Sequence, residues 1–310
     1  MQSGSTSNSA EMIMTVPISF FYHWQNIPDE MYPNVMREFR DNGVRNLVAT
    51  QWLLERMIRE PALPMTLKTM LRNTGMRFFE AHGICSTGND LACTDRFRRP
   101  GMIADHKLAM GCAAELGCKT YVVHMGAYES VYFRTPNEEL RPNVIEALEQ
   151  LLPEAEKLGL MIALENSYEI ANTPDEVLYY IRHFNHPNLA CCLDAGHANV
   201  MAPGPGKSPD RYHPDVIDAW HGHVVQYDGA LEAMAPWIVT MHLHDNNGFA
   251  DQHNLPGTGT IDWPGLAAKI EKLPRLVSLQ SEVKNGPSAS WSIRKLCETF
   301  RHIFPDHPMG

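Results

Sequence analysis

The chain contains 310 residues, of which 44% are hydrophobic, and this is enough to build the core of two ordinary domains or of one α/β barrel. Its 26 Lys and Arg residues are outnumbered by 36 Asp and Glu residues, which gives a formal net charge of −10 at pH 7. This balance excludes a generally basic surface for nucleic acid, leaves a local basic groove open, and favours chemistry on small molecules.

The N-terminal stretch predicts no targeting or membrane segment. Residues 1–12 are rich in Ser, Gly and Asn, so we expect a disordered leader there and a single domain over residues 13–306. The stretch lacks the apolar region of a signal peptide, and no run reaches the roughly 18 apolar residues of a membrane span. The seven cysteines are odd in number and form no CxxC motif, which favours reduced thiols. The sequence therefore predicts a cytoplasmic protein without membrane contacts.

Short apolar, β-branched runs alternate along the chain with longer segments of helical periodicity. The runs that predict strands span residues 17–23, 45–50, 77–83, 120–126, 160–167, 189–197, 238–245 and 276–283. Segments with helical periodicity or helix-start signals span residues 28–43, 105–117, 141–159 and 173–184, and some of them end on Gly.

Eight such β-α repeats without a linker predict the α/β class and a single (β/α)8 TIM barrel. Nearly continuous apolar strands are what a parallel sheet buried on both faces requires. A doubly wound sheet is the structural alternative. It is disfavoured because no GxGxxG motif follows the first run and no P-loop is present.

Polar residues stand where the predicted strands end, and in such barrels the active site lies at the carboxyl ends of the strands. These residues are His82, His124, Glu165, Asp194 with His197 close behind it, His244 and Glu282. One strand-end His or Glu is usually a satisfied polar group, but so many at one rim would be costly without a cation. His, Asp and Glu without Cys predict a divalent metal ion, with manganese, zinc, cobalt or magnesium all admissible.

Several motifs together resemble the xylose isomerase-like barrel superfamily, which includes sugar isomerases, epimerases and endonuclease IV. The motifs occur in order from about the third strand to the C-terminus, and their combination is more specific than any one of them. They read ALENS, CLDAGH, HLHDNNGFADQH, PGTGTIDW and QSEV.

This resemblance implies metal ligands at Glu165, Asp194, His244 and Glu282. It also implies a place for His197 beside the substrate, as in the epimerases, or on a metal, as in endonuclease IV. His242 lies two positions before His244 and points to the same side in a regular strand. The resemblance assigns only the second histidine to the metal, so we expect His242 to be structural or to support a ligand.

The resemblance leaves two enzymatic functions open. In a sugar isomerase or epimerase, or a related keto-sugar lyase or dehydratase, Glu165 and Glu282 would exchange a proton beside a metal-chelated carbonyl, with His197 as a further catalytic residue. In an endonuclease IV-like zinc phosphodiesterase acting on abasic DNA, additional metals would be held by His82, His124, Asp251 and His253. These four residues could instead contact a sugar substrate.

The charge balance favours a small sugar or sugar derivative as the partner over nucleic acid. A specific ketose 3-epimerase or aldose isomerase is less well supported. Ala250 stands where the former usually have arginine, and Ser167 stands where the latter have lysine. A non-catalytic metal-binding or sugar-binding barrel is the third alternative, although the presence of both glutamates weakens it. A homo-oligomer stays open.

Two further segments are expected at the mouth of the site. The aromatic residues of 20–24 and 51–52 are candidates for walls on which a sugar ring stacks, or for ordinary core packing. The long connection at 198–230 is rich in Gly, Pro and His and is predicted to form either a lid or an oligomer contact.

Overall fold

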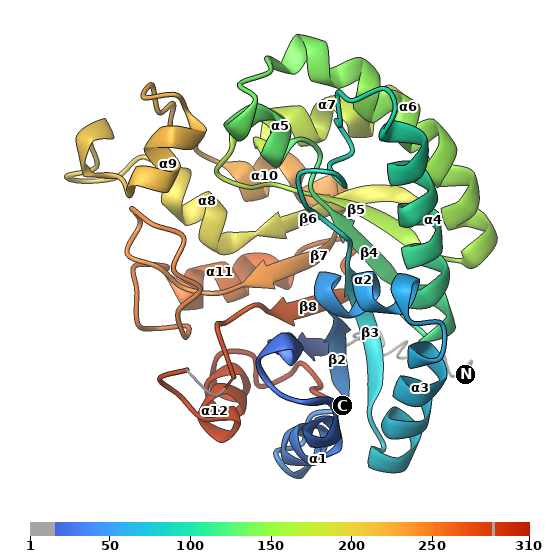
Figure 1. Cartoon of the computed structure of the whole chain (residues 1–310). Coiled ribbons are helices and arrows are strands. Elements are labelled where there is room, and N and C mark those ends of the chain that lie inside the picture. Colours follow the sequence, from blue (N-terminus) through green and yellow to red (C-terminus); the bar gives the residue numbers. More distant parts are fainter. Residues whose placement is uncertain (1–15, 287–288) are drawn as a thin grey trace, which may run out of the picture.

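The strands of the protein close into a parallel barrel in which each strand pairs with its sequence neighbours and β1 pairs with β8 (Figure 1). The computed structural model describes residues 16–286 and 289–310, so the leader predicted at 1–12 lies outside the described residues. The strands are β1 (Ile18–Phe20), β2 (Asn46–Ala49), β3 (Arg77–His82), β4 (Thr120–Val123), β5 (Met161–Glu165), β6 (Leu189–Asp194), β7 (Ile238–Leu243) and β8 (Ser278–Ser281). The predicted single (β/α)8 TIM barrel is confirmed.

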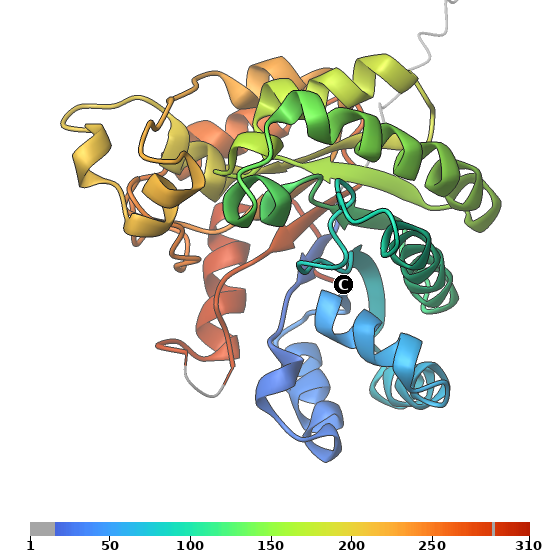
Figure 2. The same cartoon turned by 45° about the horizontal axis from the view of Figure 1, so that its top comes forward.

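The helices surround the barrel on its outer side, as the turned view makes clear (Figure 2). The α-helices are α1 (Tyr32–Asp41), α2 (Gln51–Arg59), α3 (Leu63–Thr74), α4 (Arg99–Glu115), α5 (Ala127–Tyr132), α6 (Asn137–Leu158), α7 (Pro174–Phe184), α8 (Ala195–Met201), α9 (Pro214–Ala219), α10 (Ala230–Met234), α11 (Trp263–Ile270) and α12 (Ile293–Ile303). Single 3₁₀ turns are η1 (Trp24–Asn26), η2 (Asp29–Met31), η3 (Ile170–Asn172), η4 (Pro209–Arg211) and η5 (Ala235–Trp237). Within the described residues, none of these helices is long and apolar enough to cross a membrane.

The eight predicted strands are all present, and each is shorter than the apolar run that predicts it. Every residue of β2, β4, β6 and β7 is buried, because helices cover the outer face of the sheet and side chains fill the barrel. The seven cysteines lie within the described residues as free thiols, and five of them are buried.

The barrel interior contains a carboxyl group that the sequence patterns did not reveal. Glu80 in the middle of β3 is fully buried, and its Oε1 accepts hydrogen bonds from the hydroxyls of Thr240 and Thr120. Burial raises the pKa of Glu80. The layer below the strand ends is therefore partly polar, and the hydrophobic core lies mainly between sheet and helices.

One carboxylate organises the chain between β7 and α11. The buried Asp245 accepts hydrogen bonds from the amides of Gly257 at 2.8 Å and Gly259 at 3.0 Å and from the indole nitrogen of Trp263 at 2.9 Å. A Cβ at Gly259 would lie only 2.2 Å from the carbonyl oxygen of Asn246, so only glycine fits there. The PGTGTIDW motif thus wraps around Asp245, which holds the loop carrying Asp251 and His253 against the barrel.

The connection after β6 forms a small unit of its own beside the barrel mouth. It contains α8, η4, α9 and α10; the part around α9 protrudes on one side of the barrel, whereas α10 packs against α7 and β6 (Figure 1). It has a separate hydrophobic cluster, made of Val200, Met201, Tyr212, Val216, Ala219 and Trp220. The asparagine- and histidine-rich segment after β7 packs against this unit through Phe249, which contacts Tyr212.

Candidate metal centre and substrate pocket

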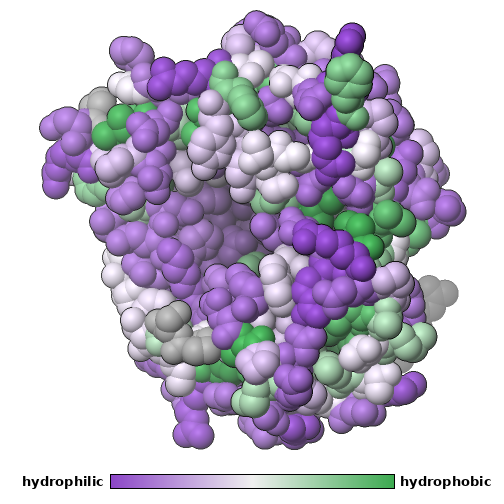
Figure 3. Space-filling view, viewed as in Figure 1, coloured by the Kyte–Doolittle hydropathy of each residue, from purple (hydrophilic) through white to green (hydrophobic). Residues whose placement is uncertain are grey.

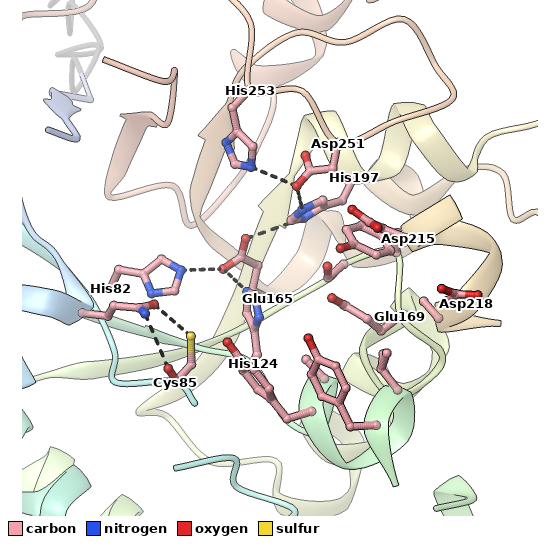
Figure 4. Close-up of a pocket in the computed structure, with 18 of the residues that line it drawn as sticks. His82, Cys85, His124, Glu165, Glu169, His197, Asp215, Asp218, Asp251 and His253 are labelled. Carbon is pink, nitrogen blue, oxygen red and sulfur yellow. Dashed lines mark hydrogen bonds and ion pairs between the residues drawn. The ribbon is translucent and has the colours of Figure 1, made fainter. Parts of the chain in front are cut away.

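Glu165 is the central residue of the cluster at the strand ends (Figure 4). It is the last residue of β5, and its side chain is almost completely buried. Glu165 Oε2 lies 3.0 Å from His124 Nε2 and 3.6 Å from His82 Nε2, and its Oε1 lies 3.0 Å from His242 Nδ1. One carboxylate therefore contacts three imidazoles that come from three other strands or their ends.

A first group of potential ligands consists of Glu165, Asp194, His242 and Glu282, whose donor atoms lie within 4.8 Å of one another. His242 Nδ1 stands between the two glutamates, at 3.0 Å from Glu165 and 3.1 Å from Glu282. The resemblance implies His244 as a metal ligand beside Glu165, Asp194 and Glu282; the structure brings His242 into this group and His244 into a neighbouring second group. Strand β7 ends at Leu243, so His242 is the last histidine that strand alternation directs into the barrel.

A second group lies beside the first and joins α8 to the loop after β7. Asp251 Oδ2 is 3.0 Å from His253 Nε2 and 3.4 Å from His197 Nε2. Asp251 and His253, predicted as additional ligands, are thus brought together with His197 and His244, and the donor atoms of these four residues lie within 4.8 Å of one another. A third group consists of His82, His124 and Glu165, so Glu165 is shared by the first and third groups.

Three of these histidines have a ring nitrogen fixed by a backbone carbonyl. A carbonyl oxygen only accepts, so Nδ1 of each ring carries the hydrogen and Nε2 faces the carboxylates. Metal-bound histidines usually donate their second N–H in this manner. The contacts are His82 Nδ1 to Gly83 O at 3.2 Å, His197 Nδ1 to Asn166 O at 3.1 Å, and His253 Nδ1 to Glu282 O at 2.8 Å.

The carboxylates also offer free acceptor atoms. Asp251 Oδ1 is buried and has no hydrogen-bond partner within the described part of the chain. Burial of a bare carboxylate oxygen is costly unless a cation or donor pairs with it. Oxygen and imidazole donors from converging strand ends, with one unpartnered buried oxygen, fit a divalent cation.

Protons on the imidazoles balance the carboxylates of the metal-free protein. Although burial opposes protonation of His124, the carboxylate of Glu165 raises the pKa of this ring to about 9. Burial likewise opposes protonation of His253, but Asp251 raises its pKa to about 9. Burial by itself would raise the pKa of Glu165, whereas His242 and His124 hold that pKa well below its ordinary value. A bound divalent cation would therefore compete with these protons.

Chelator-treated protein is expected to lose stability as the pH rises from about 6.5 to about 9. The folded pKa values of His124 and His253 are about 9, and the ordinary value is 6.5. The folded state therefore binds protons more tightly, so the stabilisation is complete below pH 6.5 and is lost as the pH passes the folded pKa. Melting temperatures recorded across this window measure the effect.

The variant His183→Gln is the control for this pH dependence, because His183 is exposed on α7, away from the three groups. It should keep the wild-type decline, whereas His124→Gln should flatten it. A melting temperature of the chelator-treated wild type that rises between pH 6.5 and 9 would contradict the assigned charge balance.

A cavity of about 630 Å³ opens above the three groups, and Figure 3 shows it as a hollow lined by hydrophilic side chains. Its lining contains six carboxylate residues, and among the described residues that line it none is Lys or Arg. The carboxylate residues are Glu165, Glu169, Asp215, Asp218, Asp251 and Glu282. A phosphorylated substrate would meet no Lys or Arg here, and the lining imidazoles are already paired with carboxylates, so the cavity suits an uncharged polyhydroxy compound better.

The aromatic walls of the cavity differ from those expected. Tyr128, Tyr132 and Tyr168 line it, whereas Phe20 and Trp24 are buried in the hydrophobic core. Of the two alternatives left open for residues 20–24, core packing therefore holds for Phe20, Tyr22 and Trp24. From residues 51–52, Gln51 reaches the cavity and Trp52 packs against the core.

Part of the pocket wall comes from acidic residues that no sequence pattern singles out. Asp215 and Asp218 lie on α9, within the long connection predicted as a lid or an oligomer contact, and Glu169 follows β5 (Figure 4). Acidic side chains are common in surface connections. Asp215 and Asp218 line the cavity only because residues 195–234 fold beside the barrel mouth, and the sequence does not distinguish them from solvent-exposed acidic residues.

Comparison with known proteins gives one family and a set of similar folds. The family described as xylose isomerase-like TIM barrel matches residues 48–293. The fold is similar to that of the 3-keto-D-glucoside 4-epimerase from E. coli in its apo form, with a TM-score of 0.68 and 16% identity, covering 93% of this chain and 98% of that one. It is also similar to the IOLI protein with a binding zinc atom, with a TM-score of 0.66 and 17% identity over 94% and 97% of the two chains.

A curated relative matches part of the chain. An uncharacterized protein from Methanocaldococcus jannaschii is 26% identical over 165 residues, which cover 52% of this chain and 49% of that protein. The chain thus spans about half the length of the curated relatives it matches.

Proposed function

Because the chain belongs to the xylose isomerase-like TIM barrel family, we propose that it is a divalent-metal-dependent isomerase or epimerase of an unphosphorylated sugar or sugar derivative. The observation that carries this proposal is a cavity lined by six carboxylate residues and no described Lys or Arg, directly above imidazole and carboxylate donors. Proton transfer in a keto-sugar lyase or dehydratase would use the same groups.

The four residues of the first group, Glu165, Asp194, His242 and Glu282, are the ones that would hold the ion. When bound there, a divalent ion supplies Lewis-acid polarisation of a substrate carbonyl. The similarity to a zinc-containing protein of the same fold supports this assignment, while the choice among manganese, zinc, cobalt and magnesium stays open.

The chain's own contribution is to hold and move a proton. Glu165 is the last residue of β5, and Glu282 follows β8. One carboxylate oxygen of each lies close to His242 Nδ1, at 3.0 Å for Glu165 and 3.1 Å for Glu282. In the proposed reaction one carboxylate removes a proton from the carbon beside the carbonyl and the other returns it. His197, whose Nδ1–H is bound to the carbonyl of Asn166, presents Nε2 to the cavity and can orient a substrate hydroxyl.

Phosphodiester hydrolysis is the second candidate function, and the neighbouring groups of ligands favour it. Glu165 bridges the first and third groups, and multinuclear sites of this kind activate water and stabilise a leaving oxygen in phosphoesterases. The acidic cavity argues against it, because abasic DNA would need Lys or Arg to neutralise its phosphates.

Incubation in heavy water distinguishes these functions. With manganese or cobalt, the protein is expected to incorporate deuterium beside the carbonyl of unphosphorylated keto- or aldo-sugars. The same sugars carrying a phosphate should react at least about tenfold more slowly, since a phosphate would face six carboxylate residues and no described Lys or Arg. Exchange is measured by NMR or mass spectrometry.

Cleavage of abasic DNA with zinc, without exchange into any sugar, would favour the nuclease instead. Saturable sugar binding without either reaction would favour a non-catalytic barrel. A strict requirement for phosphorylated sugars would contradict the inference drawn from the acidic lining.

A further inference from the structure

His244 is fully buried and belongs to the second group of potential ligands, where it lies beside the first group. Its Nε2 is 3.1 Å from Asp194 Oδ2 in the first group. Its ring stacks on that of His253 in the second group, with centroids 3.8 Å apart and ring planes 14° from parallel. His244 therefore contacts one residue of each group, through a different kind of interaction in each case.

This stacked geometry argues against His244 and His253 as ligands of one ion. The lone pair of an imidazole nitrogen lies in the plane of its ring, so two parallel rings stacked face to face direct their lone pairs into separate planes. One ion cannot lie in both planes at once. Although His244 is close enough to be counted among the donors of the second group, its contacts suit support of Asp194 and His253 better than coordination.

Gly196 provides the space that His244 occupies. A Cβ built on Gly196 would lie 2.0 Å from His244 Cε1 and 2.4 Å from its Nδ1, which no side chain could tolerate without displacing the ring. Gly196 is in the first turn of α8 and has no left-handed backbone, so its conformation does not demand glycine. Glycine is required at this position because the ring of His244 approaches it so closely.

We propose that His244 is a positioning residue that fixes Asp194 by a hydrogen bond and His253 by stacking, and that Gly196 is required to seat it. This inference rests on the proposed metal dependence. Outer contacts of this kind orient metal ligands, and their loss typically weakens metal affinity by about 10- to 100-fold. One side chain then sets the geometry of ligands in both groups.

The variant Gly196→Ala tests this inference without altering any residue of the three groups. We expect about 10- to 100-fold weaker binding of cobalt, together with a change in the d–d absorption of the cobalt-loaded protein. Gly111→Ala is the matched control, because Gly111 also lies in a helix, α4, and a Cβ there would meet no atom within 4 Å. It should bind cobalt like the wild type, with the same spectrum.

A double-mutant cycle with His244→Asn shows whether Gly196 acts through His244. The shorter Asn removes the ring that the methyl group introduced by Gly196→Ala would strike, so this substitution should have almost no further effect on cobalt affinity in the His244→Asn background. His244→Asn by itself creates no clash, and it should weaken cobalt binding even if Gly196→Ala fails to fold. Wild-type affinity and spectrum in His244→Asn, or additive effects of the two substitutions, would overturn the inference while leaving the proposed function intact. A wild-type protein that binds no divalent ion would overturn both.

Discussion

Replacement of Glu165 by glutamine is expected to lower kcat/KM by roughly a thousandfold or more. Glu165 contacts His82, His124 and His242 and belongs to two of the three groups of ligands. A glutamine amide has a similar shape but cannot accept a proton from carbon, and it is a poor ligand for a divalent ion. Turnover and bound metal are measured together on the purified variant, with circular dichroism to show that the barrel is folded.

The matched control for this variant is Glu169→Gln. Glu169 lines the same cavity and undergoes the same loss of charge, but it stands outside the three groups. Its replacement should change kcat/KM by less than about tenfold and leave metal binding unchanged. Glu282→Gln should resemble Glu165→Gln. If Glu165→Gln kept more than a tenth of wild-type turnover on the true substrate, proton transfer by the two glutamates would be wrong.

Replacement of Asp245 by alanine is expected to lower the free energy of unfolding by on the order of 3–5 kcal/mol. The Asp245 carboxylate accepts hydrogen bonds from the amides of Gly257 and Gly259 and from the indole of Trp263. Alanine would leave these donors without partners inside the protein. Urea unfolding followed by circular dichroism measures the loss.

Asp262→Ala is the comparison for this effect. Asp262 caps α11 by accepting a 3.1 Å hydrogen bond from the amide of Gly265, and it is exposed. Loss of a single exposed cap typically costs about 1 kcal/mol. An Asp245→Ala protein that is no less stable than Asp262→Ala would show that the loop after β7 does not depend on this carboxylate.

The barrel could be predicted from the sequence because its strands are buried on both faces. Runs such as 120–126 and 189–197 are almost wholly apolar, and they contain β4 and β6. The positions of the strand ends are predicted less accurately. An apolar residue just past the last hydrogen-bonded pair of a strand cannot be distinguished in the sequence from one inside the strand. The burial of Glu80 could not be predicted from its own strand, because the residues that stabilise it, Thr120 and Thr240, come from two other strands.

The site could be predicted where a strand end determines it, and less well elsewhere. Glu165 and Asp194 are the last residues of their strands, so position along the chain was enough to bring them together. His242, and not His244, lies in the first group because β7 ends at Leu243. His242 is still within the strand and points into the barrel, whereas His244 lies beyond its end. The acidic wall with Asp215 depends on how a long connection folds, and no local pattern encodes that.

The separate hydrophobic cluster of the connection after β6 bears on how the cavity can exchange its contents. A segment whose buried apolar side chains form a cluster apart from the main core can open as a local cooperative unit, at a lower free energy than global unfolding. The donor-bearing ends of β5 and β7 belong to the continuous barrel core. We therefore expect the amides of α9 to exchange with solvent more readily than those of β5 and β7, so that the cavity can open on the α9 side while the strand ends stay in place.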